Sequence, residues 1–208
     1  MQLEFKTDCE QATYQWERFW KGENTRPAVS AIPPKPNVVP VEKPGYASGA
    51  RGDFDPVIKQ LLAWAETHEF LADAIPFYYL EFGADHFAAL LGGDLDFREN
   101  EPGGWAIPFV KDIRRAEIHF DREGKWWRRT VEFAEALRDR CDGKLLIASN
   151  TLVANLDALA AVYGTETLLL AMLAICEDRR PRKRTDSPRQ PRRDQTAMAE
   201  APKPKTLL

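Results

Sequence analysis

The sequence has few cysteines and no paired-cysteine motif. Its 208 residues include three cysteines, Cys9, Cys141 and Cys176, and no C-x-x-C pair. An odd number of widely separated cysteines supports neither a disulfide framework nor a zinc knuckle. Reduced thiols of this kind are typical of cytosolic proteins, so we expect a cytoplasmic protein.

Long hydrophobic runs are also missing. The most apolar stretch, "LLLAMLAIC" at 168–176, is about half the length that a helix needs to span a bilayer, and it predicts a buried helix. The N-terminus, "MQLEFKTDCE", has mixed charge and no apolar segment, which argues against a signal peptide. We therefore expect no membrane association.

The common signatures of nucleotide and metal chemistry do not occur in the sequence. Neither G-x-G-x-x-G nor G-x-x-x-x-G-K-[ST] is present, so Rossmann and P-loop sites are excluded. H-E-x-x-H and G-x-S-x-G are absent too, and His, Cys and carboxylate residues form no close cluster. The sequence thus predicts neither a bound metal nor a cofactor.

Charge is distributed unevenly along the chain. The formal net charge is −3, but residues 178–208 carry a net charge of +6 and the preceding residues −9. Five prolines and almost no apolar side chains accompany this basic segment, so we expect a disordered tail. The abrupt change favours an unselected tail, for example one translated out of frame. The alternative is a polybasic arm for nucleic acid or an acidic partner, of which nucleic acid is not the expected one.

Apolar residues at helical spacing predict helices over residues 10–20, from Asp55 onward, and over 121–143. Asp55 is the expected N-cap of the second helix, because a proline in the first turn follows it. His68 is expected to be half-buried near the end of that helix. In the third helix the expected core residues recur every three or four positions: Trp126, Thr130, Phe133 and Leu137.

The strands are expected between these helices. Residues 74–80 and 145–149 are continuously hydrophobic, which is typical of parallel strands covered on both faces. A short strand is also expected at 29–32, and a last helix over 155–176 with a bend near Gly164. Alternation of strand and helix predicts an α/β fold.

One histidine lies in a conspicuous position after the first of these strands. Asp85 is the expected N-cap of a short helix, and His86 occupies its first turn. The pattern favours a partly exposed histidine without a catalytic role over a general base. The sequence leaves open the alternative that His86 is a general base.

Five stretches, in this order, carry a family resemblance. They are "RFWKGENTRP", "WAETHEFLADAIPFYYLEFGADHFAALLGGDLDF", "WAIPFV", "GKWWRRTVEFAEAL" and "GKLLIASNTLVANLDALAAVYGTETLLLAML". Over about residues 12–176 the chain resembles the N-terminal half of the uroporphyrinogen decarboxylase-like superfamily. The resemblance implies a (β/α)8 TIM-type barrel with its pocket at the C-terminal ends of the strands.

The resemblance also implies classes of substrate. Relatives include porphyrinogen decarboxylases, which need no cofactor, and corrinoid-linked methyltransferases, which use zinc. An arginine-bearing N-terminal loop of the decarboxylases has no counterpart here, because "SGARGDFDP" holds one arginine in another setting. The expected Gly-Pro of the last motif is replaced by Ala154–Asn155. We therefore expect a tetrapyrrole or corrinoid-related substrate without naming the reaction.

Strand polarity selects the candidate site residues. Glu81 ends the strand at 74–80 and Asn150 ends the strand at 145–149, so both are expected at the C-terminal rim. Trp105 is expected to form an apolar wall or lid. Glu81 is a candidate acid or base if burial raises its pKa; the alternative is a carboxylate that caps a helix or pairs with an arginine. Asp157, which resembles a family aspartate, is interpreted as structural.

The length of the chain limits the barrel. A barrel of this type needs about 250 residues, and 177 precede the basic tail. We therefore expect an N-terminal helix and proline-rich arm over 1–50, a partial barrel over 51–177 and the tail over 178–208. An unpaired strand edge predicts self-association. The chain is expected to be inactive alone, or to be a non-catalytic truncated or frameshifted fragment, or an interaction protein that uses its tail.

Overall fold

The computed structural model describes residues 2–98, 103–150, 152 and 155–178. Thirteen elements follow one another along these residues. In the first half they are α1 (Cys9–Lys21), β1 (Ser30–Ala31), the 3-10 helix η1 (Tyr46–Arg51), α2 (Phe54–Thr67), β2 (Leu71–Ala72), β3 (Phe77–Tyr79) and α3 (His86–Leu90). In the second half they are β4 (Asp94–Asp96), β5 (Trp105–Ile107), α4 (Lys125–Cys141), β6 (Leu146–Ala148), α5 (Asn155–Tyr163) and α6 (Thr165–Asp178). The predicted tail lies, except for its first residue, outside the described residues.

The centre of the fold is a parallel pair of strands, β3 and β6. Phe77 pairs with Leu146 and Tyr79 with Ala148. These strands are the two that hydrophobic runs predicted, and the expectation that they are parallel is confirmed. Together with the surrounding helices they make a mixed α/β fold.

The other strand pairs are short and antiparallel. β1 pairs with β2, and β4 pairs with β5, each as a separate two-stranded sheet. The strand expected at 29–32 is therefore present, but it joins an antiparallel pair. Across the described ranges the strands do not close into a barrel.

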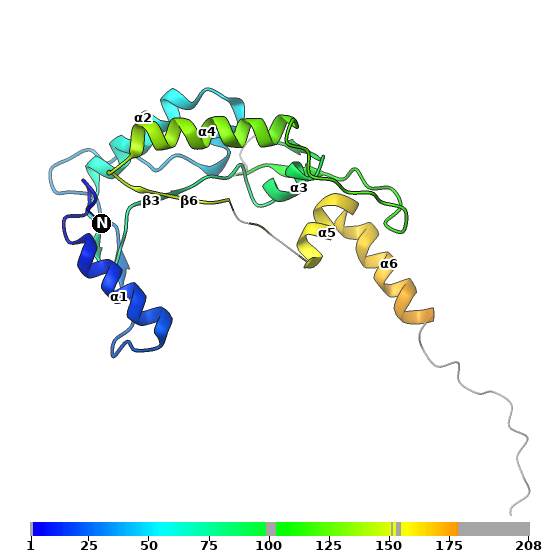
Figure 1. Ribbon diagram of the computed structural model, residues 1–208, viewed down its shortest axis with the longest axis horizontal. Coiled ribbons are helices and arrows are strands. Elements are labelled where there is room, and N and C mark those ends of the chain that lie inside the picture. The colour runs from blue at the N-terminus through cyan, green and yellow to red at the C-terminus, as the bar shows by residue number, and fades with distance from the viewer. Residues whose placement is uncertain (1, 99–102, 151, 153–154, 179–208) are drawn as a thin grey trace, which may run out of the picture.

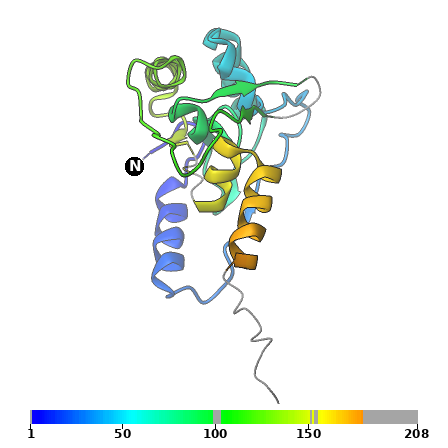
Figure 2. The ribbon, with the colours of Figure 1, turned by 90° about the vertical axis from the view of Figure 1, so that its right-hand side faces the viewer.

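Two helices cover one face of the parallel pair. Figure 1 shows α2 and α4 side by side on this face, while α1 and α5–α6 project from the two ends of the pair toward the opposite side. Figure 2 views α4 nearly end-on and shows α1 and α6 on that same side. Leu61 of α2, Phe133 of α4 and Tyr78 of β3 are fully buried between the layers.

The core stripe predicted for α4 is confirmed. Trp126, Thr130, Phe133 and Leu137 are all buried. Phe133 stacks on Phe54 of α2, with ring centroids 4.7 Å apart, and meets the Tyr78 ring edge-on. Burial of a large apolar side chain contributes about 1.5–3 kcal/mol, so this stripe accounts for the close packing of α4 on β3.

The beginning of α2 differs from the prediction. Its N-cap is Asp53 and not Asp55, because the helix begins at Phe54, two residues before Pro56. Asp55 lies in the first turn, where its carboxylate accepts a hydrogen bond from Arg140 of α4 at 2.8 Å. The C-terminal end is as expected, since half-buried His68 bonds through Nδ1 with the carbonyl of Trp64 at 2.8 Å.

The predicted bend in the last helix is present, but the predicted burial is wrong. α5 and α6 separate at Gly164, which has a φ of +91°. Leu169, Leu170 and Leu173 are 55, 60 and 61% exposed, because α6 packs chiefly against α5 and not under a further layer of the described chain. No single helix of the described ranges is long and apolar enough to cross a membrane; residues 155–163 and 165–175 reach that limit only as a pair bent by 114°.

Candidate functional site

The carboxyl edge of the parallel pair brings two of the predicted site residues to the same level. The Leu80 amide donates a hydrogen bond to the Ala148 carbonyl at 2.9 Å, which extends the pairing by one residue beyond β3. Continuing that register sets Glu81 opposite Asn150. Glu81 is 9% exposed and so lies at the margin of the core.

The amide of Asn150 has an unsatisfied donor. Its Nδ2 is buried and has no hydrogen-bond partner among the described residues. Buried polar atoms in native proteins are nearly always bonded to protein or to ordered water. A donor in this state can donate a hydrogen bond to an oxygen atom of a ligand or of a water molecule.

Trp105 lies in a different environment from Glu81 and Asn150. It begins β5, is 48% exposed, and lines an open cleft of about 670 Å³ between β5 and α5. Asp157 of α5, expected to be structural, lines the same cleft, but within the described chain Glu81 and Asn150 do not. The structure thus brings Trp105 together with Asp157 in one cleft, whereas Glu81 and Asn150 are level with each other when the register of β3 and β6 is continued.

A close backbone crossing positions the β5 strand. Gly83 has a φ of +121°, and a Cβ there would collide with the backbone amide of Gly104. The Gly104 amide donates a hydrogen bond to the Phe82 carbonyl at 3.0 Å. The Asp85 carboxylate accepts a second bond across this crossing, from the Ala106 amide at 2.9 Å. These contacts fix Trp105 beside the end of the segment that follows β3.

His86 is fully buried, so the expectation of a partly exposed histidine is wrong. It is 1% exposed, because α3 packs its first turn beneath α4 and against the ring of Phe82. The Phe82 amide donates to its Nδ1 at 3.3 Å, so Nε2 carries the proton and donates to Thr130 Oγ1 at 2.9 Å. The Thr130 hydroxyl then donates to the Trp126 carbonyl at 2.7 Å.

The environment of His86 fixes its charge. Burial lowers its pKa from the usual 6.5 to about 4, because a charged imidazolium loses its hydration in this site. A neutral histidine with both nitrogens bonded inside the protein serves to join α3 to α4. The arrangement does not favour the alternative role as a general base.

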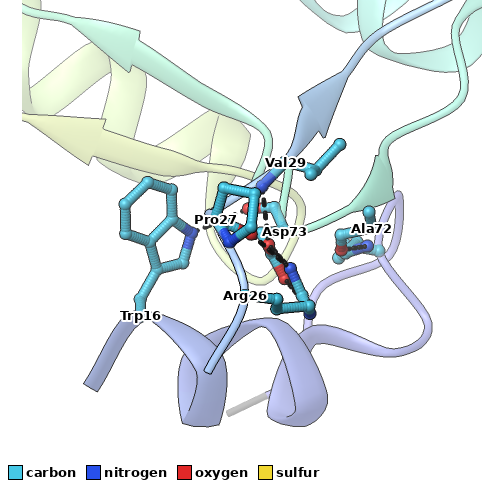
Figure 3. Close-up of polar contacts among 7 residues, drawn as sticks. Trp16, Arg26, Pro27, Val29, Ala72 and Asp73 are labelled. Carbon is cyan, nitrogen blue, oxygen red and sulfur yellow. Dashed lines mark hydrogen bonds and ion pairs between the residues drawn. The ribbon is translucent and has the colours of Figure 1, made fainter. Parts of the chain in front are cut away.

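At the amino-terminal side of the parallel pair lies a charged cluster that the sequence did not single out. The Asp73 carboxylate, only 3% exposed, accepts two hydrogen bonds from Arg26, at 2.7 and 2.8 Å, and one from the Val29 amide at 2.8 Å. Figure 3 shows these groups directed at Asp73, with the Trp16 indole donating to its carbonyl at 2.7 Å. The Arg26 guanidinium, the largest cause, and the Val29 amide lower the pKa of Asp73 to about 2 despite its burial.

The Asp73 cluster is structural. It ties α1, the residues before β1 and the residues after β2 into one unit, far along the strands from Glu81 and Asn150. Lys6, which is 2% exposed, supports the same region by donating hydrogen bonds to the carbonyls of Phe70 and Ala72, both at 2.8 Å. The sequence did contain a hint that Arg26 has a role, since Arg26 belongs to the first stretch that carries the family resemblance.

Within the described ranges, no three His, Cys, Asp or Glu side chains lie close enough together to hold a metal ion. Comparisons with protein-family models, with curated proteins and with solved structures give no match to the chain.

Proposed function

We propose that this chain is a uroporphyrinogen decarboxylase-like domain, built as part of a (β/α)8 barrel, that binds a tetrapyrrole or corrinoid-related compound at the carboxyl edge of β3 and β6. The observation that carries the proposal is the parallel register of β3 and β6, which puts Glu81 level with Asn150 when it is continued by two residues. Ligands of parallel α/β folds bind outside the carboxyl ends of the strands.

The two residues supply complementary chemistry. The buried, unsatisfied Nδ2 of Asn150 is suited to an acceptor oxygen, such as a propionate or acetate group of a tetrapyrrole. Glu81, at the margin of the core, is the candidate acid or base. Trp105 contributes an apolar wall from the neighbouring cleft.

The edges of the parallel pair support self-association. In the described chain β3 and β6 form a sheet of two strands, and the outer edges of a parallel sheet are normally paired with further strands. A second copy or another polypeptide that supplies these strands would also complete the pocket. We therefore propose that turnover requires such a partner and that the isolated chain binds without reacting.

Titration with coproporphyrin, uroporphyrin and hydroxocobalamin tests the binding. We expect one of these compounds to bind, detected by a shift of its visible absorption band, and Asn150→Leu to weaken the affinity about tenfold, since a bond to a charged oxygen contributes about 1.5–3 kcal/mol. Asn24→Leu is the matched control, because Asn24 also has a buried amide without a partner in the described chain but lies between α1 and β1. Absence of binding by all three compounds, or equal losses in the two variants, contradicts the proposal.

A further inference from the structure

A second pocket opens on the helical side of the molecule. It has a volume of about 420 Å³ and lies between η1, the residues around β4 and the beginning of α4. Neither Glu81 nor Asn150 belongs to any of these elements. The pocket is therefore distinct from the edge of the parallel pair, although Arg98 also lines the cleft that holds Trp105.

All charged side chains on the described lining of this pocket are basic. They are Arg51 of η1, Arg98 after β4, and Lys125 and Arg129 of α4. Three of them have acidic neighbours outside the lining: Arg98 lies 3.4 Å from Asp96, Lys125 lies 3.1 Å from Asp94, and Arg129 lies 3.8 Å from Glu132.

Arg51 leaves the cluster with an excess of positive charge. Its side chain is exposed, and within the described residues it has no ion pair or hydrogen bond. Among the described residues, Arg51 is therefore a guanidinium that has no carboxylate partner for an incoming anion to displace. The cost of displacing an existing ion pair does not arise at this residue.

Arg129 is held in place against the end of η1 that carries Arg51. Its side chain is 25% exposed, and Nη1 donates a hydrogen bond to the Ala50 carbonyl at 2.6 Å. That bond uses one of the five N–H donors of the guanidinium. Gly52 leaves room for this group, because a Cβ at Gly52 would lie 2.5 Å from Nη1. A fixed guanidinium loses little conformational freedom when it binds a ligand.

The remaining walls are apolar. Phe97 is 38% exposed, and Leu95 and Trp126 are buried at the base of the pocket. Trp126 is fixed by a hydrogen bond from its indole to the Asp94 carboxylate at 2.8 Å. A ligand that fills this space needs an apolar body next to its charged group, because an inorganic ion would leave these walls uncovered.

We propose that this pocket binds a small organic anion whose phosphate or carboxylate group contacts Arg51, Lys125 and Arg129 and whose planar apolar body packs against Phe97. Phosphate and carboxylate are both possible, because the planar guanidinium of an arginine binds a pair of oxygens of either group in the same geometry. The site is open to solvent, so the attraction is screened by salt.

Isothermal titration with 1-naphthyl phosphate, 1-naphthoate and 1-naphthol tests the pocket. We expect at least one of the two anions to bind and neutral 1-naphthol not to bind. The stronger of the two anions identifies the preferred group. Arg51→Gln should weaken binding about tenfold, which corresponds to about 1.4 kcal/mol, and raising the NaCl concentration should weaken it further.

Arg138→Gln is the matched control. Arg138 is exposed on the same helix, pairs with Asp139, and does not line the pocket. Arg129→Gln is a second test, with far-ultraviolet circular dichroism to verify folding. Because Arg51 is exposed and makes no bond within the described structure, its substitution leaves the fold intact and its result is decisive. No binding by either anion, equal binding of 1-naphthol, or equal losses in Arg51→Gln and Arg138→Gln would overturn the proposal.

Discussion

At the scale of single residues, His86 is a pH-sensitive support of the fold. Its two ring nitrogens complete a chain of hydrogen bonds that runs from the Phe82 amide through Thr130 to the Trp126 carbonyl. This chain requires the neutral imidazole, because a protonated Nδ1 cannot accept from an amide. Protonation of His86 is therefore coupled to unfolding.

We expect the free energy of unfolding to decrease as the pH falls from about 6.5 to about 4. The unfolded chain binds a proton on His86 near pH 6.5, whereas the native protein resists it until about pH 4, so acid favours the unfolded state. The full effect is about 3 kcal/mol. Urea unfolding at pH 7 and at pH 4.5 measures it. Asp73 remains ionised over this range, because its pKa is about 2.

Two variants separate His86 from other acid-sensitive groups. His86→Gln should be less stable than the wild type at pH 7 but should lose less stability on acidification. His119→Gln, at an 81% exposed side chain, should behave like the wild type at both pH values. If His86→Gln retains the whole acid-dependent loss, the coupling does not come from His86.

At the scale of elements, the crossing of Gly83 and Gly104 sets where β5 can lie. The segment after β3 and the segment before β5 touch through backbone atoms, so no side chain fits between them. A substitution at Gly83 acts on the arrangement of two elements and not only on a local backbone angle.

Gly83→Ala should lower the free energy of unfolding by at least about 2 kcal/mol, since it adds a left-handed strain and an overlap with fixed backbone. Gly22→Ala is the matched control: Gly22 also has a positive φ, +71°, but faces open space. It should cost about 1 kcal/mol. Denaturant unfolding of both variants provides the measurement; similar losses would mean that the crossing is not tightly packed.

The elements also show what sequence reasoning can predict. The periodic stripe of α4 and the continuous runs of β3 and β6 identified real elements, because burial selects side chains at regular spacing. The Asp73 cluster and the pairing of β1 with β2 were not predicted. Both join segments distant in the sequence through a few local hydrogen bonds, which leave no periodic pattern. The basic pocket was not predicted for the same reason, since its three arginines come from three separate segments of the chain.

The candidate site was predicted only in part. Strand polarity predicts Glu81 and Asn150 at one level, and the observed register of β3 and β6 agrees with this when it is continued by two residues. Their role as site residues stays a prediction. The separation of Trp105 from these residues depends on the antiparallel pairing of β4 with β5 and on the Gly83 crossing. The burial of His86 depends on α4, which lies about forty residues further along the chain.

At the scale of the whole molecule, the apolar residues have two different environments. Those of α2 and α4 are enclosed around β3, whereas Leu169, Leu170, Leu173 and Ile175 of α6 face solvent. The buried residues of α2 and α4 should therefore contribute most of the free energy of unfolding.

Leu61→Ala should reduce the free energy of unfolding by about 2–5 kcal/mol, because Leu61 is fully buried and its removal leaves a cavity. The double variant Leu170→Gln with Leu173→Gln should change it by about 0.5 kcal/mol or less at monomeric concentrations, because both side chains are about 60% exposed. Thermal unfolding followed by circular dichroism compares them. A large loss in the double variant would show that α6 is covered in solution.

The Asp73 cluster described above closes the chain into a short non-covalent loop. Trp16 and Arg26 hold the same aspartate from two sides, one through its carbonyl and the other through its carboxylate. Proteolytic cleavage between them, for example next to Gly22, would therefore cut the polypeptide without releasing α1. The two pieces would stay attached in native buffer, because Trp16 and Lys6 of the first piece donate hydrogen bonds to backbone carbonyls of the second, and they would separate in denaturant.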